Sequence, residues 1–217
     1  GPTGQVFVEC MRVRPDVGES KTVILFSHPV GGGSFLPLVS ALARAGRHVI
    51  YCNPRYRGND TALIMEKCVL DLGACIADLK TRFGYEKVVL GGWSGGGSLS
   101  LFYQDQAQTP TITHTPAGDE VDIVGAGLQA ADGVLLLAAH ISRSVTMTEW
   151  LDPSILDEAR PFERDVSLNL YDPGFPETAP YSPEFVRRFR QAQIDRNRRI
   201  TAWAKNQLAG LKAAGDP

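Results

Sequence analysis

The sequence lacks long hydrophobic runs and an excess of either charge. No apolar run reaches the roughly 18 residues that a membrane helix needs, which argues against a membrane span. Lysine and arginine number 22 against 24 aspartates and glutamates, for a net charge of −2. Because nucleic-acid binding relies on clustered positive charge, this balance argues against a nucleic-acid partner. The 217 residues are 43% hydrophobic, too much for a disordered chain.

Cysteine is scarce and shows no metal-binding spacing. Cys10, Cys52, Cys68 and Cys75 lie in apolar surroundings without the paired spacing of a zinc knuckle, and four is few for a disulfide-held chain of this size. We therefore expect buried thiols and no metal site. The sequence also lacks an initial methionine and a signal segment. Its Gly-Pro start looks like the remnant of a cleaved tag, and we expect a cytoplasmic protein.

Over the first 140 residues, short apolar runs alternate with segments of helical periodicity. The run from Val23 to Phe26 is continuous, as in a central strand covered on both faces. The alternation predicts an α/β fold, a mostly parallel sheet with helices on both faces. The expected strands are residues 5–13, 22–27, 47–52, 87–90 and 134–139, and the expected helices begin near residues 35 and 63 and at Ser94 or Gly95.

This pattern is interrupted once and then ends. Residues 109–127 are polar and rich in threonine, and we expect a small hairpin there. After residue 140, prolines punctuate a region of loops and helices that closes with one long helix over about 183–211. The sequence thus predicts two parts, residues 1–140 and residues 141–217, with no buried strand after residue 139.

A glycine-rich turn at residues 92–96 carries the main chemical signal. Its sequence, GWSGG, fits G-x-S-x-G, with a buried strand before it and a helix after it. Such a turn lifts the serine hydroxyl out of the sheet, and we expect Gly92 and Gly96 to leave room for the crowded backbone. The helix start also directs N–H groups toward a forming oxyanion. We predict Ser94 as a nucleophile and the Gly95 N–H as an oxyanion donor.

The alternative interpretation of this turn is a phosphate-binding or merely connecting loop. Its spacing fits neither the P-loop pattern nor G-x-G-x-x-G, which disfavours phosphate binding by those routes.

A second motif, HPVGGG at residues 28–33, follows the strand at 22–27. With the serine turn, it makes residues 5–140 resemble the α/β-hydrolase superfamily, in which this loop supplies the other half of the oxyanion hole. The resemblance implies that Val30, or as second choice Gly31, donates the second N–H, because Pro29 has none. It also implies that His28 shapes the loop beside the substrate and transfers no proton.

The remaining histidines receive different predictions. His140 ends the last expected strand, at the edge where α/β sheets bind ligands. We expect His28, Trp93 and His140 to contact the substrate; His140 has two alternatives, as the start of a cap and as the general base. His48 and His114 have no supporting context, and we expect them at the surface or in turns.

Two arginine-containing regions have separate predictions, the first from the resemblance and the second from the charge pattern. The loop at residues 53–60 is similar to an arginine-glycine loop of the superfamily, and its arginines are expected to brace neighbouring elements, with a place at the rim of the active site as the alternative. The arginine-rich face of the last helix is expected to be solvated, the alternatives being an anionic substrate or another chain.

Residues 141–217 fall where the superfamily often inserts a helical cap over the active site. Six large apolar side chains of this region either line an apolar pocket or pack the cap onto the sheet: Trp150, Leu151, Phe162, Tyr171, Phe175 and Tyr181.

A serine nucleophile needs a base and an acid that orients it, and the superfamily places both after later strands. No such strands are visible, and only His114 and His140 follow Ser94. We expect the acid and base to come from a C-terminal portion or a second chain. The alternatives are an inactive binding or scaffold protein, and His140 serving Ser94 directly.

The function expected from these motifs is serine hydrolysis. Ser94 would form an acyl-enzyme from an ester, lactone, thioester or amide, with water completing the reaction. The partner is then a small acyl substrate, and no cofactor and no membrane are expected.

Overall fold

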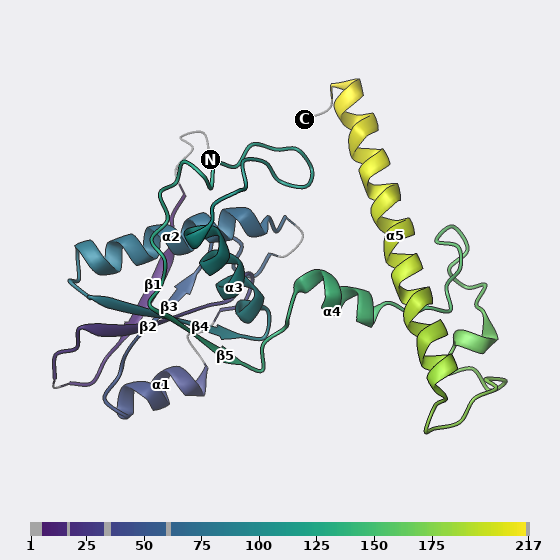
Figure 1. The fold of residues 1–217 in the computed structure, drawn as a ribbon, viewed down its shortest axis with the longest axis horizontal. Coiled ribbons are helices and arrows are strands. Elements are labelled where there is room, and N and C mark those ends of the chain that lie inside the picture. The colour runs from purple at the N-terminus through teal and green to yellow at the C-terminus, as the bar shows by residue number, and fades with distance from the viewer. Residues whose placement is uncertain (1–5, 17, 33–35, 60–61, 216–217) are drawn as a thin grey trace. The chain divides into compact units, whose positions relative to one another are not determined.

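The computed structural model describes residues 6–16, 18–32, 36–59 and 62–215. The chain divides into two compact units, Gly1–Ser142 and Arg143–Pro217, which are considered separately below. Each unit has its own architecture, drawn in Figure 1.

The first unit is built on a five-stranded sheet whose strand order is β1-β3-β2-β4-β5. All neighbouring pairs are parallel except β1 and β3, which pair antiparallel. The predicted α/β fold is therefore confirmed. The strands are β1 (Glu9–Val13), β2 (Thr22–Ser27), β3 (His48–Asn53), β4 (Lys87–Trp93) and β5 (Gly133–Leu137).

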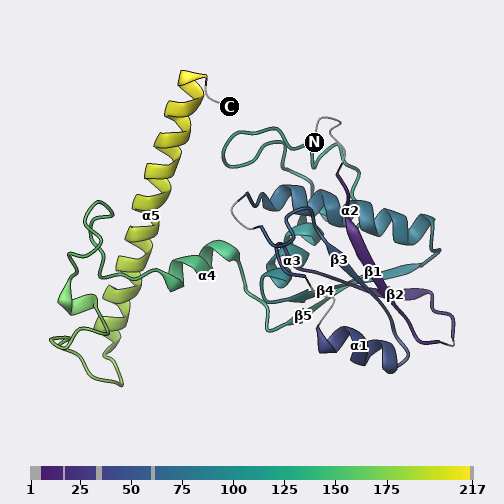
Figure 2. The same cartoon turned by 180° about the vertical axis from the view of Figure 1, so that it is seen from behind.

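Helices cover both faces of this sheet, as Figures 1 and 2 show from opposite sides. Helix α1 (Pro37–Arg44) packs on one face, and α2 (Met65–Thr81) and α3 (Gly95–Gln108) pack on the other. The side chains of β2 alternate between the two cores: Leu25 joins the α2 and α3 side, whereas Phe26 joins the α1 side. A strand buried on both faces explains the continuous apolar run in the sequence.

The carboxyl ends of three parallel strands meet at one edge of the sheet. Ser27 pairs with Gly92, and Trp93 pairs with Leu137, so β2, β4 and β5 end side by side. The residues that follow these strands, beginning at His28, Ser94 and Ala138, are thereby gathered at the ligand-binding edge of an α/β sheet.

Three expected elements differ in extent or regularity in the structure. The first strand covers only Glu9–Val13, and helix α1 begins at Pro37, whose fixed φ suits a first helical position. Phe35 and Gly33, expected at or before that helix start, lie outside the described residues. The hairpin expected at 109–127 forms as a short, irregular excursion, in which His114 and Glu120 make an antiparallel bridge, the Thr115 N–H donates to the Asp119 carbonyl at 2.8 Å and the Val121 N–H donates to the Thr113 carbonyl at 3.0 Å. This excursion buries Val121 and Ile123 in the core beside α3, and that packing replaces a regular ladder.

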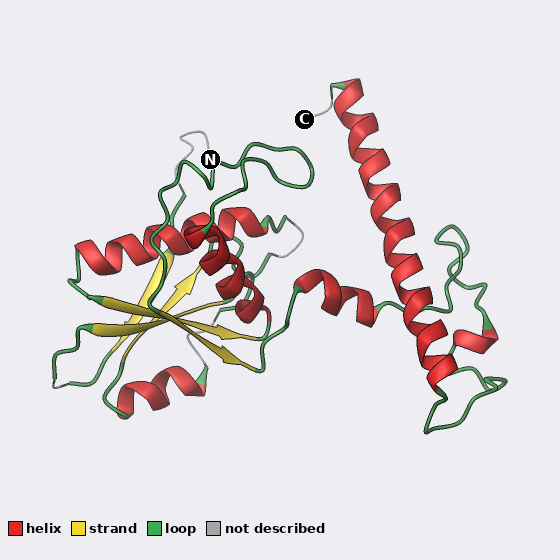
Figure 3. Ribbon diagram, viewed as in Figure 1, coloured by secondary structure: helices red, strands yellow, loops and turns green. Residues whose placement is uncertain are grey.

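The second unit holds α4 (Arg143–Trp150), a short 3-10 helix at Val166–Leu168 and α5 (Pro183–Ala214); no strand occurs among its described residues (Figure 3). The Ser182 hydroxyl accepts a hydrogen bond from the Phe185 N–H and caps α5, which ends at the left-handed Gly215. Arg196 pairs with Glu158 and ties the loop region to α5. Within the described residues, no helix combines the length and the apolar character needed to cross a membrane.

Candidate active site

Ser94 stands at a strained backbone turn between β4 and α3. Its φ is 53° and its ψ is −123°, a conformation that glycine adopts readily and other residues rarely do. Such a position costs on the order of 1–3 kcal/mol and persists only where the surrounding structure enforces it. Sharp strand-to-helix turns of this kind raise a serine hydroxyl above the edge of a sheet. The strain thus coincides with the residue predicted to be the nucleophile.

The glycines around Ser94 are required by close backbone packing. A Cβ at Gly92 would lie 2.4 Å from the Gly97 Cα, and a Cβ at Gly96 would lie 2.1 Å from the Ser27 carbonyl oxygen. A Cβ at Gly97 would lie 2.2 Å from the Ala139 Cβ. Of these three, sequence reasoning had assigned a packing role to the first two and missed Gly97, although the glycine run at 95–97 contained the signal.

Hydrogen bonds hold this turn against the end of β5. The Ser94 N–H donates to the Leu137 carbonyl at 3.3 Å, and the His140 N–H donates to the Ser94 carbonyl at 3.0 Å. Between them, Ala138 has a φ of 44°, a second strained non-glycine residue. The structure therefore brings the backbone of His140 beside Ser94, and nothing in the local sequence indicated the strain at Ala138.

His28 connects the glycine loop to the serine turn. Its Nδ1 accepts hydrogen bonds from the Gly31 N–H at 2.8 Å and the Val30 N–H at 3.3 Å. Because Nδ1 is an acceptor, the proton of the neutral ring belongs on Nε2. Nε2 lies 3.1 Å from the point where a Cβ on Gly95 would stand, and the ring lies 6.0 Å from the Trp93 ring. His28 thus shapes its loop and faces the first turn of α3.

This arrangement bears on the predicted oxyanion donors. Gly95 is the first residue of α3, where backbone N–H groups have no partner within the helix. The N–H groups of Val30 and Gly31 instead point at His28 Nδ1. That these N–H groups stabilise an oxyanion stays a prediction. To do so, each N–H must either leave His28 Nδ1 for the oxyanion or donate to both acceptors.

The two histidines without sequence context differ in their surroundings. His48 opens β3 at the opposite edge of the sheet and is only 2% exposed, so its expected surface position is wrong. Burial is tolerated because its Nδ1 pairs with the Tyr85 hydroxyl at 2.8 Å and its Nε2 with the Gly18 carbonyl at 3.3 Å. His114 lies exposed in the excursion, where its Nδ1 pairs with the Thr113 hydroxyl.

The arginine loop after β3 braces other elements. The backbone N–H, Nε and Nη2 of Arg55 donate hydrogen bonds to the Asp71 carboxylate of α2, with the shortest distance, from Nη2, at 2.6 Å. The Asp71 side chain is 2% exposed, and this pairing raises the pKa of Arg55. Arg57 pairs with Glu9 at the exposed edge of β1. Both contacts match the bracing role expected from the sequence.

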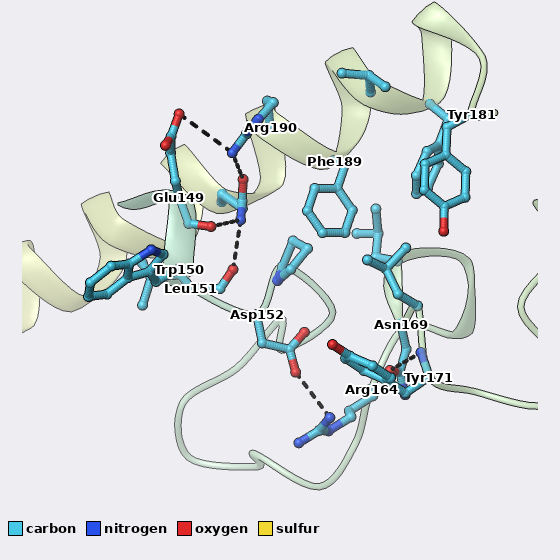
Figure 4. A pocket seen from close by; sticks show the side chains of 16 residues that line it. Glu149, Trp150, Leu151, Asp152, Arg164, Asn169, Tyr171, Tyr181, Phe189 and Arg190 are labelled. Atoms are coloured by element: carbon cyan, nitrogen blue, oxygen red, sulfur yellow. Dashed lines mark hydrogen bonds and ion pairs between the residues drawn. The ribbon is translucent and has the colours of Figure 1, made fainter. Parts of the chain in front are cut away.

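The second unit contains a cavity of about 520 Å³ between α4, α5 and the loop residues (Figure 4). Six side chains were expected either to line a pocket or to pack the cap onto the sheet, and four of them line this cavity, namely Trp150, Leu151, Tyr171 and Tyr181. Phe175 instead stacks against Tyr181 and Phe185, and Phe162 is 92% exposed.

One wall of this cavity is held by a buried amide. The Gln193 side chain is 3% exposed and donates to the carbonyls of Glu149 and Leu151, which fixes the end of α4 on α5. Arg190 and Arg164 also line the cavity, but each is paired with a carboxylate of the same lining, so the two pairs add no net charge. The cavity is therefore mainly apolar with a polar rim.

Comparison of the sequence with protein-family models and with curated proteins finds no match. Several solved structures are similar in fold. Esterase B from Lactobacillus rhamnosis is 16% identical with a TM-score of 0.42; the match covers 67% of this chain and 53% of the esterase, so the chain spans about half the length of that protein.

Two further solved structures match longer or shorter portions of the chain. An esterase from the Planctomycetes species Thermogutta terrifontis is 20% identical with a TM-score of 0.45, over 88% of this chain and 73% of its own. An alpha-beta serine hydrolase homologue from Coxiella burnetii is 19% identical with a TM-score of 0.38, over 65% of this chain and 85% of its own. Because the sequence identities and TM-scores of these matches are low, the function is inferred below from the geometry of the chain's own residues.

Proposed function

We propose that this chain carries the nucleophile and the oxyanion-binding turn of a serine hydrolase. The observation that carries the proposal is the strained backbone of Ser94, enclosed by glycines that admit no side chain, at the carboxyl edge of a parallel sheet. A turn that merely connected a strand to a helix would relax into an ordinary conformation, because strain of this size must be maintained by packing.

The proposed chemistry begins with attack by Ser94 Oγ on an acyl carbonyl of an ester, lactone, thioester or amide. The negative charge that develops on the carbonyl oxygen is stabilised by the Gly95 N–H at the start of α3, with the loop of Val30 and Gly31 as the second donor. Loss of the alcohol, thiol or amine leaves an acyl-enzyme. Water then attacks the acyl carbonyl, and the carboxylic acid departs with Ser94 restored.

His28 has a supporting role in this proposal. Its Nδ1 holds the N–H groups of Val30 and Gly31, and its Nε2 proton faces the first turn of α3. Because Nδ1 is occupied by two donors, the ring is set up to donate from Nε2 and not to accept a proton there. It therefore orients the oxyanion loop and contacts the substrate, and Ser94 needs another base.

The proposal assigns that base and its orienting acid to polypeptide outside these 217 residues, supplied as a further portion of the chain or as a second chain. Support comes from β5, which pairs with β4 on one side only among the described strands and exposes 46% of Leu136. An open, apolar edge next to Ser94 is a place where additional strands can pair. His140 remains the alternative base, since its backbone is bonded to Ser94.

A fluorophosphonate probe tests the nucleophile and separates these bases. Labelling at Ser94 that is absent in Ser94→Ala supports the proposal. If the 217-residue chain is labelled alone and His140→Gln abolishes the labelling, the base is His140. If only the native polypeptide recovered from cells is labelled, the base comes from outside. Absence of labelling in both forms contradicts the nucleophile.

A second candidate, an inactive protein that binds acyl compounds, has one observation in its favour. The N–H groups of Val30 and Gly31 are engaged by His28, which closes half of the expected oxyanion site. The distinguishing result is saturable binding of a short-chain ester to the native protein with neither hydrolysis nor probe labelling.

A further inference from the structure

Three cysteines from three separate elements meet beside helix α2. Cys10 lies on β1, Cys52 on β3 and Cys75 on α2, and their sulfur atoms all lie within 4.8 Å of one another. The shortest contact with a given distance joins Cys10 Sγ to Cys75 Sγ at 3.5 Å. Cys10 is also the register partner of Cys52 across the antiparallel pair of strands. This cluster plays no part in the proposed hydrolytic site.

The three thiols differ in their access to solvent. Cys10 is exposed on the edge strand β1, which corrects the expectation that all four cysteines are buried. Cys52 is 0% exposed and Cys75 is 7% exposed, since both face the core between the sheet and α2. Cys10 is thus the one exposed residue of the cluster, and its sulfur contacts two buried thiols.

Hydrogen bonding favours Cys10 as the thiolate of the cluster. A thiolate at Cys10 can accept hydrogen bonds from the thiols of Cys52 and Cys75, and these bonds lower the pKa of Cys10 to about 4, while burial and Asp78 oppose this and Arg82 adds to it. The same contacts raise the pKa of Cys75 and of Cys52. Because the thiolate is the reactive form of cysteine, the exposed member of the cluster is also the nucleophilic one.

We propose that Cys10 is a peroxide-reactive thiol that forms a reversible disulfide with Cys75. In the first step the Cys10 thiolate attacks one oxygen of hydrogen peroxide, the O–O bond breaks, and a sulfenic acid and hydroxide form. In the second step the Cys75 sulfur attacks the Cys10 sulfur, the S–O bond breaks, and the hydroxyl leaves as water with the proton of the Cys75 thiol. The hydroxide of the first step takes up the proton that the Cys10 thiol released on ionisation, so overall two thiols are oxidised to a disulfide and one peroxide is reduced to two waters.

The second step is favoured by the first. The largest cause of the raised pKa of Cys75 is its hydrogen bond to the Cys10 thiolate, and this cause disappears once Cys10 is a neutral sulfenic acid. The two sulfur atoms then need to approach from 3.5 Å to the roughly 2.0 Å of a disulfide. The product ties the edge strand β1 to α2.

A metal ion bound by the same three sulfurs is less favourable. Metal ligation requires thiolates at Cys52 and Cys75, and both lie in apolar surroundings that disfavour charge. A disulfide buries no charge. The cluster is therefore assigned to thiol oxidation.

The experiment treats the purified 217-residue chain with a small molar excess of hydrogen peroxide and counts free thiols under denaturing conditions. We expect the loss of two thiols and of two hydrogens in intact mass, both restored by a dithiol reductant. Cys10→Ser abolishes the loss. Cys75→Ser leaves a sulfenic acid that a dimedone probe captures at Cys10. Cys68→Ser, which removes another buried thiol of α2, serves as the matched control and leaves the reaction unchanged.

Peptide mapping identifies the bond. Trypsin separates Cys10, Cys52 and Cys75 onto different peptides, but Cys68 shares a peptide with Cys75, so the cross-link is mapped in the Cys68→Ser variant as well. A disulfide to Cys52, loss of two thiols in Cys10→Ser, no thiol loss at all, or stoichiometric zinc in the purified protein overturns the proposal. Repetition in Ser94→Ala separates this chemistry from the hydrolytic site, because the disulfide is expected to form there equally.

Discussion

The backbone conformation of Ser94 costs stability, although its side chain is needed for the proposed reaction. Its φ of 53° places a side chain where glycine would be easier to accommodate, so the structure retains a serine at a cost in stability. At the surrounding glycines an added Cβ would lie as close as 2.1 Å to a neighbouring atom, so no side chain fits there, whereas the side chain of Ser94 has a chemical use in the proposed function. Stability and the proposed function therefore oppose each other at this position.

Substitution of Ser94 tests this opposition. Ser94→Gly removes strain worth on the order of 1–3 kcal/mol and adds backbone entropy to the unfolded chain worth roughly 0.5–1 kcal/mol, so we expect a net gain of about 1 kcal/mol. Ser94→Ala keeps the strain and should leave stability nearly unchanged. Thermal unfolding of the three proteins measures the difference, and a lower melting temperature for Ser94→Gly would contradict the strain argument.

Arg55 is the second residue with a measurable consequence. Its removal leaves the carboxylate of Asp71, which is 2% exposed, without its guanidinium partner. Loss of one partner of a largely buried pair costs on the order of 3 kcal/mol. We therefore expect Arg55→Ala to lower the free energy of unfolding by about that amount, as measured by urea denaturation.

The matched control for this effect is Arg57→Ala, two residues away. Arg57 pairs with Glu9 at the surface, with side chains 49% and 67% exposed, and exposed pairs contribute roughly 0–1 kcal/mol. Equal losses in the two variants would show that burial of Asp71 does not determine the cost.

At the scale of elements, the close approach of α3 to the sheet depends on its first residues. The glycines at 95–97 allow α3 to start directly from β4 and to contact the ends of β2 and β5. Helix α5 also contains a glycine, Gly210, but no atom lies within 4 Å of where its Cβ would stand. Glycine is therefore required by close packing at the start of α3, whereas at position 210 of α5 a side chain would fit.

This contrast gives a paired prediction. In Gly97→Ala, the new methyl group meets the Ala139 Cβ at 2.2 Å, and we expect a loss of about 1–3 kcal/mol from overpacking. In Gly210→Ala, the improved helix propensity should stabilise the exposed helix by up to about 1 kcal/mol. Calorimetric unfolding of both variants checks the signs, and two changes of the same sign would refute the packing explanation.

At the scale of the whole molecule, the sheet of the first unit has unequal edges. The edge formed by β1 carries Arg57 and Glu9 as an ion pair, which discourages further pairing. The edge formed by β5 exposes Leu135 and Leu136 and adjoins the serine turn. The proposed source of the base outside these residues depends on this second edge.

A test of that edge uses the 217-residue chain in isolation. An uncovered apolar edge strand promotes self-association, and a charged residue on it interferes with pairing. We expect concentration-dependent association in light scattering and a marked reduction in Leu136→Lys. A chain that stays monomeric at high concentration, with or without this substitution, would argue that the β5 edge does not accept further strands.

Much of the fold and part of the site were predictable from local patterns. Alternation of apolar runs and helical periodicity indicated all five strands and three helices of the first unit, because the hydrophobic period of a strand or helix is visible within a few consecutive residues. The G-x-S-x-G turn identified Ser94 and Gly95, since crowding of a turn restricts the residue types within it. The antiparallel pairing of β1 and the strain at Ala138 were not predictable from such patterns.

The sequence by itself determined where the strands and helices lie and which serine stands at a crowded turn, because propensity, periodicity and steric limits act over a few neighbouring residues. Only the tertiary structure decided which distant groups meet. It buried His48 against Tyr85, turned the N–H groups of Val30 and Gly31 toward His28, and brought Cys10 within 3.5 Å of Cys75, 65 positions along the chain. Such meetings follow from strand order and from the face that each helix covers, which depend on packing of the whole sheet.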